Sequence, residues 1–421
     1  MKLRHTRPTA RRVGSSFLVC ACGLFGLVSM VLAMRADSVD LEVYRAGGEA
    51  VLAGRDLYNE PVWYDFRFTY PPFAALVFTP LSPLSAEAAR VLVVLLNTSL
   101  LVFIVALSWR SLGLTRTHLL VPAVIAVSGA SFALESVHSN FIDGQINLLL
   151  VALVLADLTG RTDHPVRGVG VGLAAALKLT PLVFVAYLIV TRKYRQAAVA
   201  SATAAGTVLV SFLLVPAAAT DYWLRGMFTD LSRIHVDPAS RHNQSLRGLL
   251  LKNGVPETPA LWLWLVFGAA VGVAALSLAA WATRRGERLL GVSLCGLCAA
   301  AVSPWSWGHH WVWLVPLGVF LVSVVGRPGR RNRWLPTLVL VACALPGVLA
   351  LADPMDDDAT PVLADGPLAF VLANFYMIIF MTVLAAAVAD LRGRHTPPAG
   401  RPPGSLIGPA TAHPSHLSRE E

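Results

Sequence analysis

Residues 13–34 read VGSSFLVCACGLFGLVSMVLAM, an apolar run of 22 residues without a charged side chain, and RADSVDLEVY follows at 35–44. A helix needs about 20 apolar residues to cross a membrane, so this run predicts the first transmembrane span. Its length favours a retained anchor over a cleaved export signal, although two arginines precede it. The acidic stretch that follows places carboxylates at the water-facing end of this span.

The composition of the whole chain is that of a polytopic membrane protein. Its 421 residues are 55% hydrophobic and only 14% charged, and the mean hydropathy is +0.62. A soluble domain needs more charge on its surface. Backbone groups in lipid must be paired internally, and the sequence lacks the short alternation of barrel strands, so the spans are predicted to be helices. The net charge of +9 comes from arginines in short loops and therefore indicates topology, not nucleic-acid binding.

Clusters of arginine and lysine fix the predicted orientation, because such residues gather in cytoplasmic loops. With both termini in the cytoplasm, the long segments 35–87, 217–257 and 352–366 lie outside. Spans are predicted at 13–34, 88–109, 118–137, 146–159, 197–216, 258–282, 289–303, 309–326, 334–351 and 367–390. We expect a basic cytoplasmic N-terminus at 1–12, one transmembrane domain at 13–390 and a disordered cytoplasmic tail at 391–421.

Segment 168–191 does not fit a simple crossing, because the basic loops on both sides of it belong to the cytoplasm. Its centre reads KLTP at 178–181, which combines a charge with a helix-breaking proline. We therefore predict a re-entrant pair of half-helices with Lys178 at the tip, since broken helices are tolerated where they line a cavity. The lysine then either faces an anion such as a lipid phosphate, or snorkels or pairs with an internal acid. Segment 73–84 is short and bounded by prolines, and is either interfacial or a second re-entrant element.

The first outer loop, at 35–72, contains a candidate general base. Asp40 lies near the end of the first span, where a carboxylate is able to accept the proton of an attacking hydroxyl. Asp37, Asp40 and Asp56 are also suited to capping short interfacial helices. The aromatic residues of the loop, among them Tyr44 and Tyr70, either stack on a sugar or form an interfacial belt.

Two further polar clusters lie on the same predicted side, and polar groups at membrane depth tend to be functional. In the patch at 135–147, Gln145 and Asn147 either hydrogen-bond sugar hydroxyls or join neighbouring helices. The stretch at 241–247 suits a phosphate or pyrophosphate through charge-assisted bonds, or else is a solvated loop at the lipid headgroups. Its residues are Arg241, His242, Asn243, Gln244, Ser245, Leu246 and Arg247.

Paired histidines lie in the stretch SPWSWGHHWVW at 303–313. Adjacent side chains point to different faces of a helix, so His309 and His310 alone do not predict a shared metal ion. A neutral histidine here serves as a base or orients a carboxylate, and a protonated one neutralises a leaving phosphate. Alternatively, Trp305 and Trp307 belong to an interfacial tryptophan belt around one buried histidine.

Taken in order along the chain, these motifs resemble glycosyltransferase family 87, the bacterial polyprenol-phosphate-mannose-dependent mannosyltransferases with the GT-C fold. The matching residues are Asp40-Leu41-Glu42-Val43-Tyr44, Gly47-Gly48, Leu57-Tyr58, Thr69-Tyr70-Pro71-Pro72, Gly144-Gln145-Ile146-Asn147, Lys178-Leu179-Thr180-Pro181, Asn243-Gln244-Ser245, Ser303-Pro304-Trp305-Ser306-Trp307 and His309-His310. The resemblance extends over roughly residues 10–390.

The resemblance implies an all-α polytopic membrane protein, a GT-C-type bundle of about 10–12 transmembrane or re-entrant segments whose outer loops form the active site. It implies an enzyme of the plasma membrane that works on the extracytoplasmic side. The implied donor is polyprenyl-phosphate-mannose, and the implied acceptor is a lipid-linked glycan of the phosphatidylinositol mannoside or lipomannan type. The implied product is an α-1,2 linkage formed by an inverting displacement.

The resemblance also implies roles for individual residues. The acidic residue of the family's first outer loop is its proposed catalytic residue, which here is Asp40, with Asp37 as the neighbouring alternative. His309 or His310 would assist this base, and Lys178 with Arg241 or Arg247 would stabilise the departing lipid phosphate. The full set of expected substrate-binding residues is Asp37, Tyr44, Tyr70, Gln145, Asn147, Lys178, Arg241, His242, Asn243, Gln244, Arg247, Trp305 and Trp307.

We expect no metal ion and no cofactor, because protein cations are able to stabilise a phosphate leaving group. A lipid or glycolipid transporter is the alternative class of function. Such a transporter would show related halves and charges near the membrane midplane, whereas the polar residues here lie at the outer mouths of the predicted helices. A transferase for another sugar, such as arabinofuranose, is a second alternative, because sugar identity depends on a few hydrogen bonds.

Overall fold

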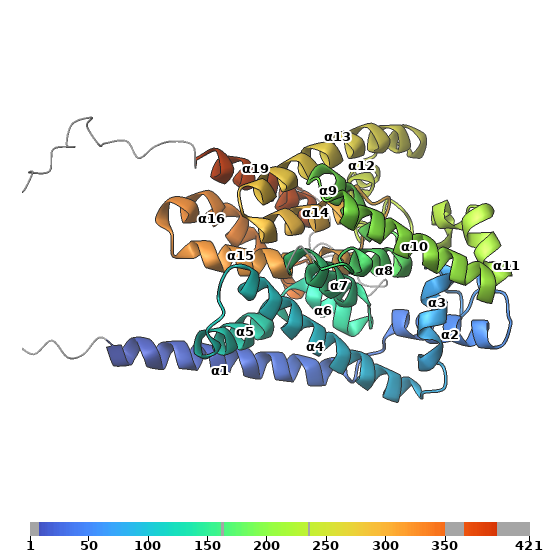
Figure 1. The fold of residues 1–421 in the computed structure, drawn as a ribbon, viewed down its shortest axis with the longest axis horizontal. Coiled ribbons are helices and arrows are strands. Elements are labelled where there is room, and N and C mark those ends of the chain that lie inside the picture. The colour runs from blue at the N-terminus through green and yellow to red at the C-terminus, as the bar shows by residue number, and fades with distance from the viewer. Residues whose placement is uncertain (1–7, 161–163, 235, 350–365, 394–421) are drawn as a thin grey trace, which may run out of the picture.

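The computed structural model describes residues 8–160, 164–234, 236–349 and 366–393 (Figure 1). Within these ranges every regular element is a helix, as the apolar composition predicts. The acidic outer segment 352–366 and the tail at 391–421 lie almost entirely outside the described residues, as does most of the basic N-terminus at 1–12.

In the described part of the chain, five helices are long and apolar enough to cross a membrane. They are α1 (Pro8–Ala33), α4 (Ala86–Ser111), α10 (Tyr194–Leu214), α13 (Glu257–Arg284) and α19 (Phe375–Arg392). These helices confirm the spans predicted at 13–34, 88–109, 197–216, 258–282 and, in its second part, 367–390. The chain is therefore a multi-pass membrane protein.

The remaining apolar helices are shorter and form the interior of the bundle. α14 (Arg288–Val302) is buried along nearly its whole length and packs against α13, α15 (Leu314–Val325) and α19. By contrast, α1, α10 and α13 expose apolar side chains such as Phe17, Leu213 and Val266. A helix that is apolar on all sides belongs in a core or in lipid, and the exposed side chains identify which helices face lipid.

The span predicted at 118–137 is bent, and this bend positions the polar patch that follows. α5 (Thr117–Ser131) is followed by α6 (Glu135–Ile142), which turns away at an angle of 77°. The polar residues expected to link two spans instead form α6, which packs on the short helix η6 (Gly308–Trp311). A straight span would have carried this patch away from the paired histidines.

The predicted break at Lys178 is confirmed. α8 (Val169–Leu177) ends there, the Lys178 backbone is extended, and η2 (Thr180–Leu182) leads into α9 (Val183–Val190). Both halves pack on α10, while α7 (Asn147–Thr159) covers α8 and α14 covers α9. The lysine therefore lies between helices inside the bundle.

The segment after the first span forms a small helical layer at one end of the molecule (Figure 1). α2 (Val39–Leu52) packs on α3 (Pro72–Phe78) and on η1 (Thr79–Leu81), and α3 also contacts α10. Further helices of the second half of the chain are α12 (Leu246–Lys252), α16 (Pro328–Ala342), α17 (Pro346–Leu349) and α18 (Pro367–Ala373). Shorter elements take the place of two predicted spans. The span predicted at 309–326 corresponds to η6 and α15, and the span predicted at 334–351 corresponds to α16 and α17.

Candidate functional site

The first turn of α2 brings Asp40 to the turn that ends α6. Ser38 Oγ donates a hydrogen bond to the last carbonyl of α6 at 2.9 Å, and Leu41 N donates to Asp143 O at 3.2 Å. Gly144 has φ +71°, and a Cβ there would lie only 2.7 Å from Leu41 Cβ. Only glycine permits this close approach without strain, and the approach holds the two aspartates near each other.

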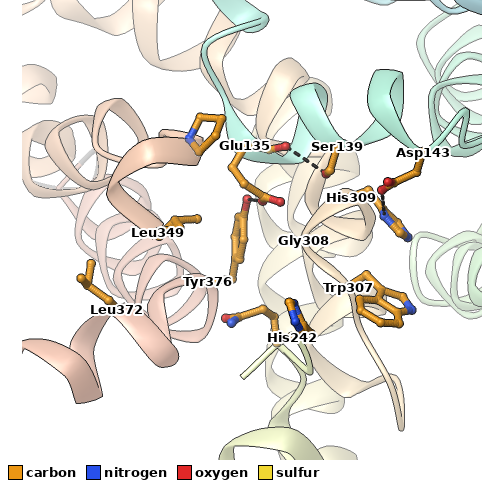
Figure 2. Close-up of a pocket in the computed structure, with 12 residues that line it drawn as sticks. Glu135, Ser139, Asp143, His242, Trp307, Gly308, His309, Leu349, Leu372 and Tyr376 are labelled. Atoms are coloured by element: carbon orange, nitrogen blue, oxygen red, sulfur yellow. Dashed lines mark hydrogen bonds and ion pairs between the residues drawn. The ribbon is translucent and has the colours of Figure 1, made fainter. Parts of the chain in front are cut away.

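Asp40, Asp143 and His309 form a cluster at the centre of the site. Their oxygen and nitrogen atoms lie within 4.8 Å of one another. His309 is buried and its Nδ1 lies 3.3 Å from Asp143 Oδ2. Figure 2 marks this contact with a dashed line. Two carboxyl groups and an imidazole from three distant stretches therefore share one small volume.

Lys178 adds a cation to this cluster. Its Nζ lies 2.8 Å from His310 Nε2 and 3.2 Å from Asn147 Oδ1. The same nitrogen is 5.4 Å from the centre of the Tyr70 ring, a cation–π distance. The broken helix thus turns the lysine toward the histidine pair.

A buried hydrogen-bonded layer supports the charged groups. Tyr44 Oη lies 2.9 Å from Tyr70 Oη and donates to Gln145 Oε1 at 2.9 Å. Asn147 Nδ2 donates to the same Gln145 oxygen at 3.2 Å. All four side chains are buried, which contradicts the interpretation of Tyr44 and Tyr70 as an interfacial belt. Gln145 and Asn147 do join neighbouring elements, and through them the layer orients the lysine.

Burial raises the pKa of both carboxyl groups. For Asp40, burial has the largest effect on the pKa. His309, a hydrogen bond from Gln145 and the charge of Lys178 lower the pKa of Asp40, whereas the charge of Asp143 raises it. Burial raises the pKa of Asp143 to about 7, although nearby His138 lowers it. Both carboxyl groups therefore hold a proton more readily than an exposed aspartate does.

The neighbouring aspartates of the first outer loop lie in different settings. Asp37 is fully exposed, and its ion-pair partner is Arg90 at 3.7 Å. Asp56 accepts hydrogen bonds from the backbone N–H groups of Tyr58 and Asn59, but these stabilise a turn. No helix begins at this point of the described chain, so the helix-capping interpretation is wrong for Asp56. It is also wrong for Asp40, because the N-cap of α2 is Ser38 and Asp40 lies inside the first turn.

The loop at 241–247 is attached to the tryptophan stretch. Asn243 Oδ1 accepts hydrogen bonds from the backbone N–H groups of Ser245 and Ser306, and Gln244 N donates to Ser306 O at 2.7 Å. Arg247, expected to bind phosphate, is instead buried in an ion pair with Glu257 at 3.0 Å. Asn243 and Arg247 thus stabilise the loop.

The other residues of the loop at 241–247 and of the tryptophan stretch at 303–313 lie around the paired histidines. The ring of His242 lies 5.7 Å from that of Trp307, and Trp307 is stacked 6.1 Å from His309. Trp305 is buried against Trp307, and Arg241 is half-buried in the same loop. Because His309 is buried among these rings, the tryptophans contribute to the surroundings of the cluster as well as to any membrane interface.

Of the cavities near the cluster, two share no lining residue. The first, of about 180 Å³, is lined by Asp143, His309, Trp307, His242, Glu135 and Tyr376 among others (Figure 2). The second, of about 110 Å³, lies between α3, α8 and α10 and is mostly apolar. Its lining includes Leu179 and Pro71, which directly follow Lys178 and Tyr70. One cavity is polar and aromatic, whereas the other is a groove suited to a hydrocarbon.

Three side chains of the first cavity were not singled out from the sequence. Asp143 was visible as part of DGQIN at 143–147, an acid and a glycine directly before a helix, but only its amide neighbours were chosen. Glu135 lay at the start of the polar patch at 135–147, within the end of the span predicted at 118–137. Tyr376 lies inside an apolar run, so no local signal indicates it.

By distance alone, Asp40, Asp143 and His309 are able to hold a metal ion. However, one nitrogen of His309 already contacts Asp143, and the charge of Lys178 acts on Asp40 and on His309. The ammonium group of Lys178 therefore supplies positive charge near this cluster. That the activity needs no metal remains a prediction.

Comparison with known proteins gives consistent matches. The model of glycosyltransferase family 87 matches residues 68–304. The polyprenol-phosphate-mannose-dependent alpha-(1-2)-phosphatidylinositol mannoside mannosyltransferase of Mycobacterium tuberculosis is 34% identical over 337 residues, 74% of this chain and 75% of that protein. The protein of the same description from Mycolicibacterium smegmatis is 35% identical over 336 residues, 73% of this chain and 74% of its own length.

A third relative carries the name of a phosphatidylinositol pentamannoside mannosyltransferase. The polyprenol-phosphate-mannose-dependent alpha-(1-2)-phosphatidylinositol pentamannoside mannosyltransferase of Mycobacterium tuberculosis is 33% identical over 365 residues. The match covers 83% of this chain and 82% of that protein. No solved structure matches the chain.

Proposed function

The chain belongs to glycosyltransferase family 87, and we propose that it transfers mannose from polyprenyl-phosphate-mannose to a lipid-linked glycan. The proposed acceptor is a phosphatidylinositol mannoside or lipomannan, and the proposed product carries an α-1,2 linkage. The relatives that support this proposal are described as polyprenol-phosphate-mannose-dependent α-1,2-mannosyltransferases of such acceptors. The apolar groove beside Lys178 is a second, independent support.

The donor lipid fits the groove between α3, α8 and α10. The lining residue Ala205 on α10 is exposed, so the groove reaches the lipid-facing surface. A polyprenyl chain that enters there would run past Leu179 and bring its phosphate to Lys178. An ammonium group in a site of low polarity stabilises the charge that develops on a departing phosphate.

Asp40 is the proposed general base. An acceptor hydroxyl oxygen attacks the anomeric carbon of the donor mannose while the bond from that carbon to the phosphate oxygen breaks. The bonding electron pair leaves with the lipid phosphate, and Asp40 takes the hydroxyl proton. Attack from the face opposite the phosphate inverts the centre, so a β-linked donor gives an α-linked product.

The other members of the cluster position these groups. His310 and Asn147 contact the Lys178 ammonium group, and Asp143 contacts His309 beside the base. A neutral His309 is able to orient an ionised carboxylate or to relay its proton. The raised pKa of Asp40 suits a base, because a carboxylate of ordinary acidity is a poor proton acceptor.

We also propose that this chemistry takes place on the outer side of the plasma membrane, with both termini in the cytoplasm and residues 13–390 as one transferase domain. The basic loops of the sequence support this orientation. Cysteine labelling of the loops in intact cells would test it.

The observation that carries the proposal is the convergence of Asp40, His309 and Lys178, from three separate stretches, beside an apolar groove. The test is incubation of membranes that contain the protein with radiolabelled polyprenyl-phosphate-mannose and a panel of lipid acceptors, followed by linkage analysis. We expect an α-1,2-mannosylated glycolipid. Transfer from a nucleotide sugar without the lipid donor would contradict the proposed donor.

A further inference from the structure

The polar cavity between α6, η6 and the start of α19 is separate from the apolar groove proposed for the donor lipid. It shares no lining residue with the apolar groove. Asp143 and His309 line it, while Glu135 and Tyr376 lie across the cavity from them (Figure 2). A molecule in this cavity would therefore reach the catalytic cluster by a separate route.

The carboxylate of Glu135 is held in a fixed position in this cavity. Tyr376 Oη donates a hydrogen bond to Glu135 Oε2, and the backbone N–H of Glu135 donates to Ala344 O at 2.7 Å. On its other side, a Cβ added to Gly308 would lie 2.4 Å from both carboxylate oxygens. Tyr376 is itself fixed by stacking on Trp311, with ring centres 5.1 Å apart. A carboxylate held in this way forms hydrogen bonds without first losing conformational entropy.

The remaining walls combine an aromatic face and hydrogen-bonding groups with an apolar side formed by Pro346, Leu349 and Leu372. Trp307 and His242 present neighbouring rings, and Trp307 is half-exposed. Gln244 also lines the cavity, and its buried Oε1 has no hydrogen-bond partner among the described residues. A pyranose offers an apolar C–H face and a ring of hydroxyl donors, which match an aromatic wall and these oxygen acceptors.

We propose that this cavity binds the terminal sugar of the acceptor glycan, with Glu135 as the residue that accepts hydrogen bonds from its hydroxyl groups. This inference rests on the proposed transferase function and assigns the subsite of its second substrate. An acceptor sugar held between Glu135 and Trp307 presents one hydroxyl toward the end of the cavity where Asp143 and His309 lie. Hydroxyl recognition at Glu135 would then select which oxygen attacks.

The test separates the two substrates kinetically. Glu135→Gln keeps the shape but weakens charge-assisted hydrogen bonds, so we expect the KM for acceptor to rise about 10- to 100-fold. The KM for polyprenyl-phosphate-mannose should stay within about twofold of wild type, because the proposed donor groove shares no lining residue with this cavity. As the matched variant, Ala204→Leu partly fills the apolar groove, and it should raise the KM for donor only.

A second measurement does not depend on how well the variant folds. Acceptors that lack single hydroxyl groups are assayed with the wild-type enzyme, which should lose at least tenfold in kcat/KM for one of them. Glu135→Gln should discriminate less against that same deoxy acceptor. Equal changes in both KM values, or unchanged discrimination in a well-folded Glu135→Gln protein, would overturn the acceptor subsite.

The failure of the inference is distinguishable from failure of the proposed function. If the wild-type protein transfers nothing from polyprenyl-phosphate-mannose, the proposed function is wrong. Calorimetric binding of the acceptor glycan to wild type and to Glu135→Gln then tests the subsite directly. Equal affinities would overturn it, and a weaker variant would support it.

Discussion

Lys178 Nζ lies 2.8 Å from His310 Nε2, although 132 positions separate the two residues. Both lie where regular helix is interrupted, Lys178 between α8 and η2 and His310 within η6. Because an ammonium group only donates hydrogen bonds, His310 must present an unprotonated Nε2 to it. The contact therefore keeps His310 neutral and directs the lysine into the cluster.

The charges around Asp40 predict opposite shifts in the pH dependence of kcat/KM. Asp143 raises the pKa of Asp40, whereas Lys178 lowers it. Removing the negative charge in Asp143→Asn makes ionisation of Asp40 easier, so the acidic limb should move to lower pH. Removing the positive charge in Lys178→Gln makes ionisation harder, so the limb should move to higher pH. Shifts in the same direction would contradict this electrostatic arrangement.

Asp40→Asn should abolish most transfer while leaving donor binding intact. Loss of a general base costs about 10²–10⁴-fold in rate, and the amide preserves the shape of the side chain. Asp37→Asn is the matched control, because Asp37 is fully exposed and its variant should retain activity near that of wild type. Initial rates with labelled donor and a donor-binding assay measure both effects. A fully active Asp40→Asn protein would exclude Asp40 as the base.

Gly144→Ala should reduce both stability and activity. The residue has φ +71°, and the added Cβ would lie 2.7 Å from Leu41 Cβ, so overpacking of about 1–3 kcal/mol adds to backbone strain of about 1–2 kcal/mol. Gly54→Ala is the control, because Gly54 has φ +64° but no neighbouring atom within 4 Å. Thermal unfolding in detergent and initial rates measure the difference. Equal effects of the two substitutions would show that the contact with α2 is unimportant.

Transfer should continue after divalent ions are removed. The Lys178 ammonium group supplies the positive charge that a metal would otherwise provide to the leaving phosphate. We expect the initial rate in EDTA to stay within about twofold of the untreated rate, since no interaction with the transition state is removed. If EDTA abolishes activity and Mg²⁺ or Mn²⁺ restores it, the three ligand atoms of Asp40, Asp143 and His309 are a metal site instead.

Much of the helical structure of this protein can be predicted from short stretches of its sequence. The apolar runs predicted the five helices that are long and apolar enough to cross a membrane, together with further spans that are shorter or bent in the structure. The KLTP stretch predicted the break at Lys178. Both signals are local, because hydropathy and proline act on the segment that contains them. The ordered motifs also predicted the family, which the comparisons show.

The bend between α5 and α6 could not be predicted from the same signals. Hydropathy runs on into 132–134 without a proline or glycine, and the 77° turn becomes apparent only once α6 packs on η6. The roles of Arg247 and Asp37 were also inaccessible, because an ion pair with Glu257 and full exposure to solvent are properties of the folded chain.

The sequence by itself determined a multi-pass helical membrane protein, the position of its broken helix and the polar residues from which a site is made. Only the tertiary structure decided which of them meet: Asp143 and His309 join Asp40, whereas Asp37 does not. The physical reason is that hydropathy depends on neighbours along the chain. Contact between charged groups depends instead on how separate helices pack, and here it depends on one close approach at Gly144.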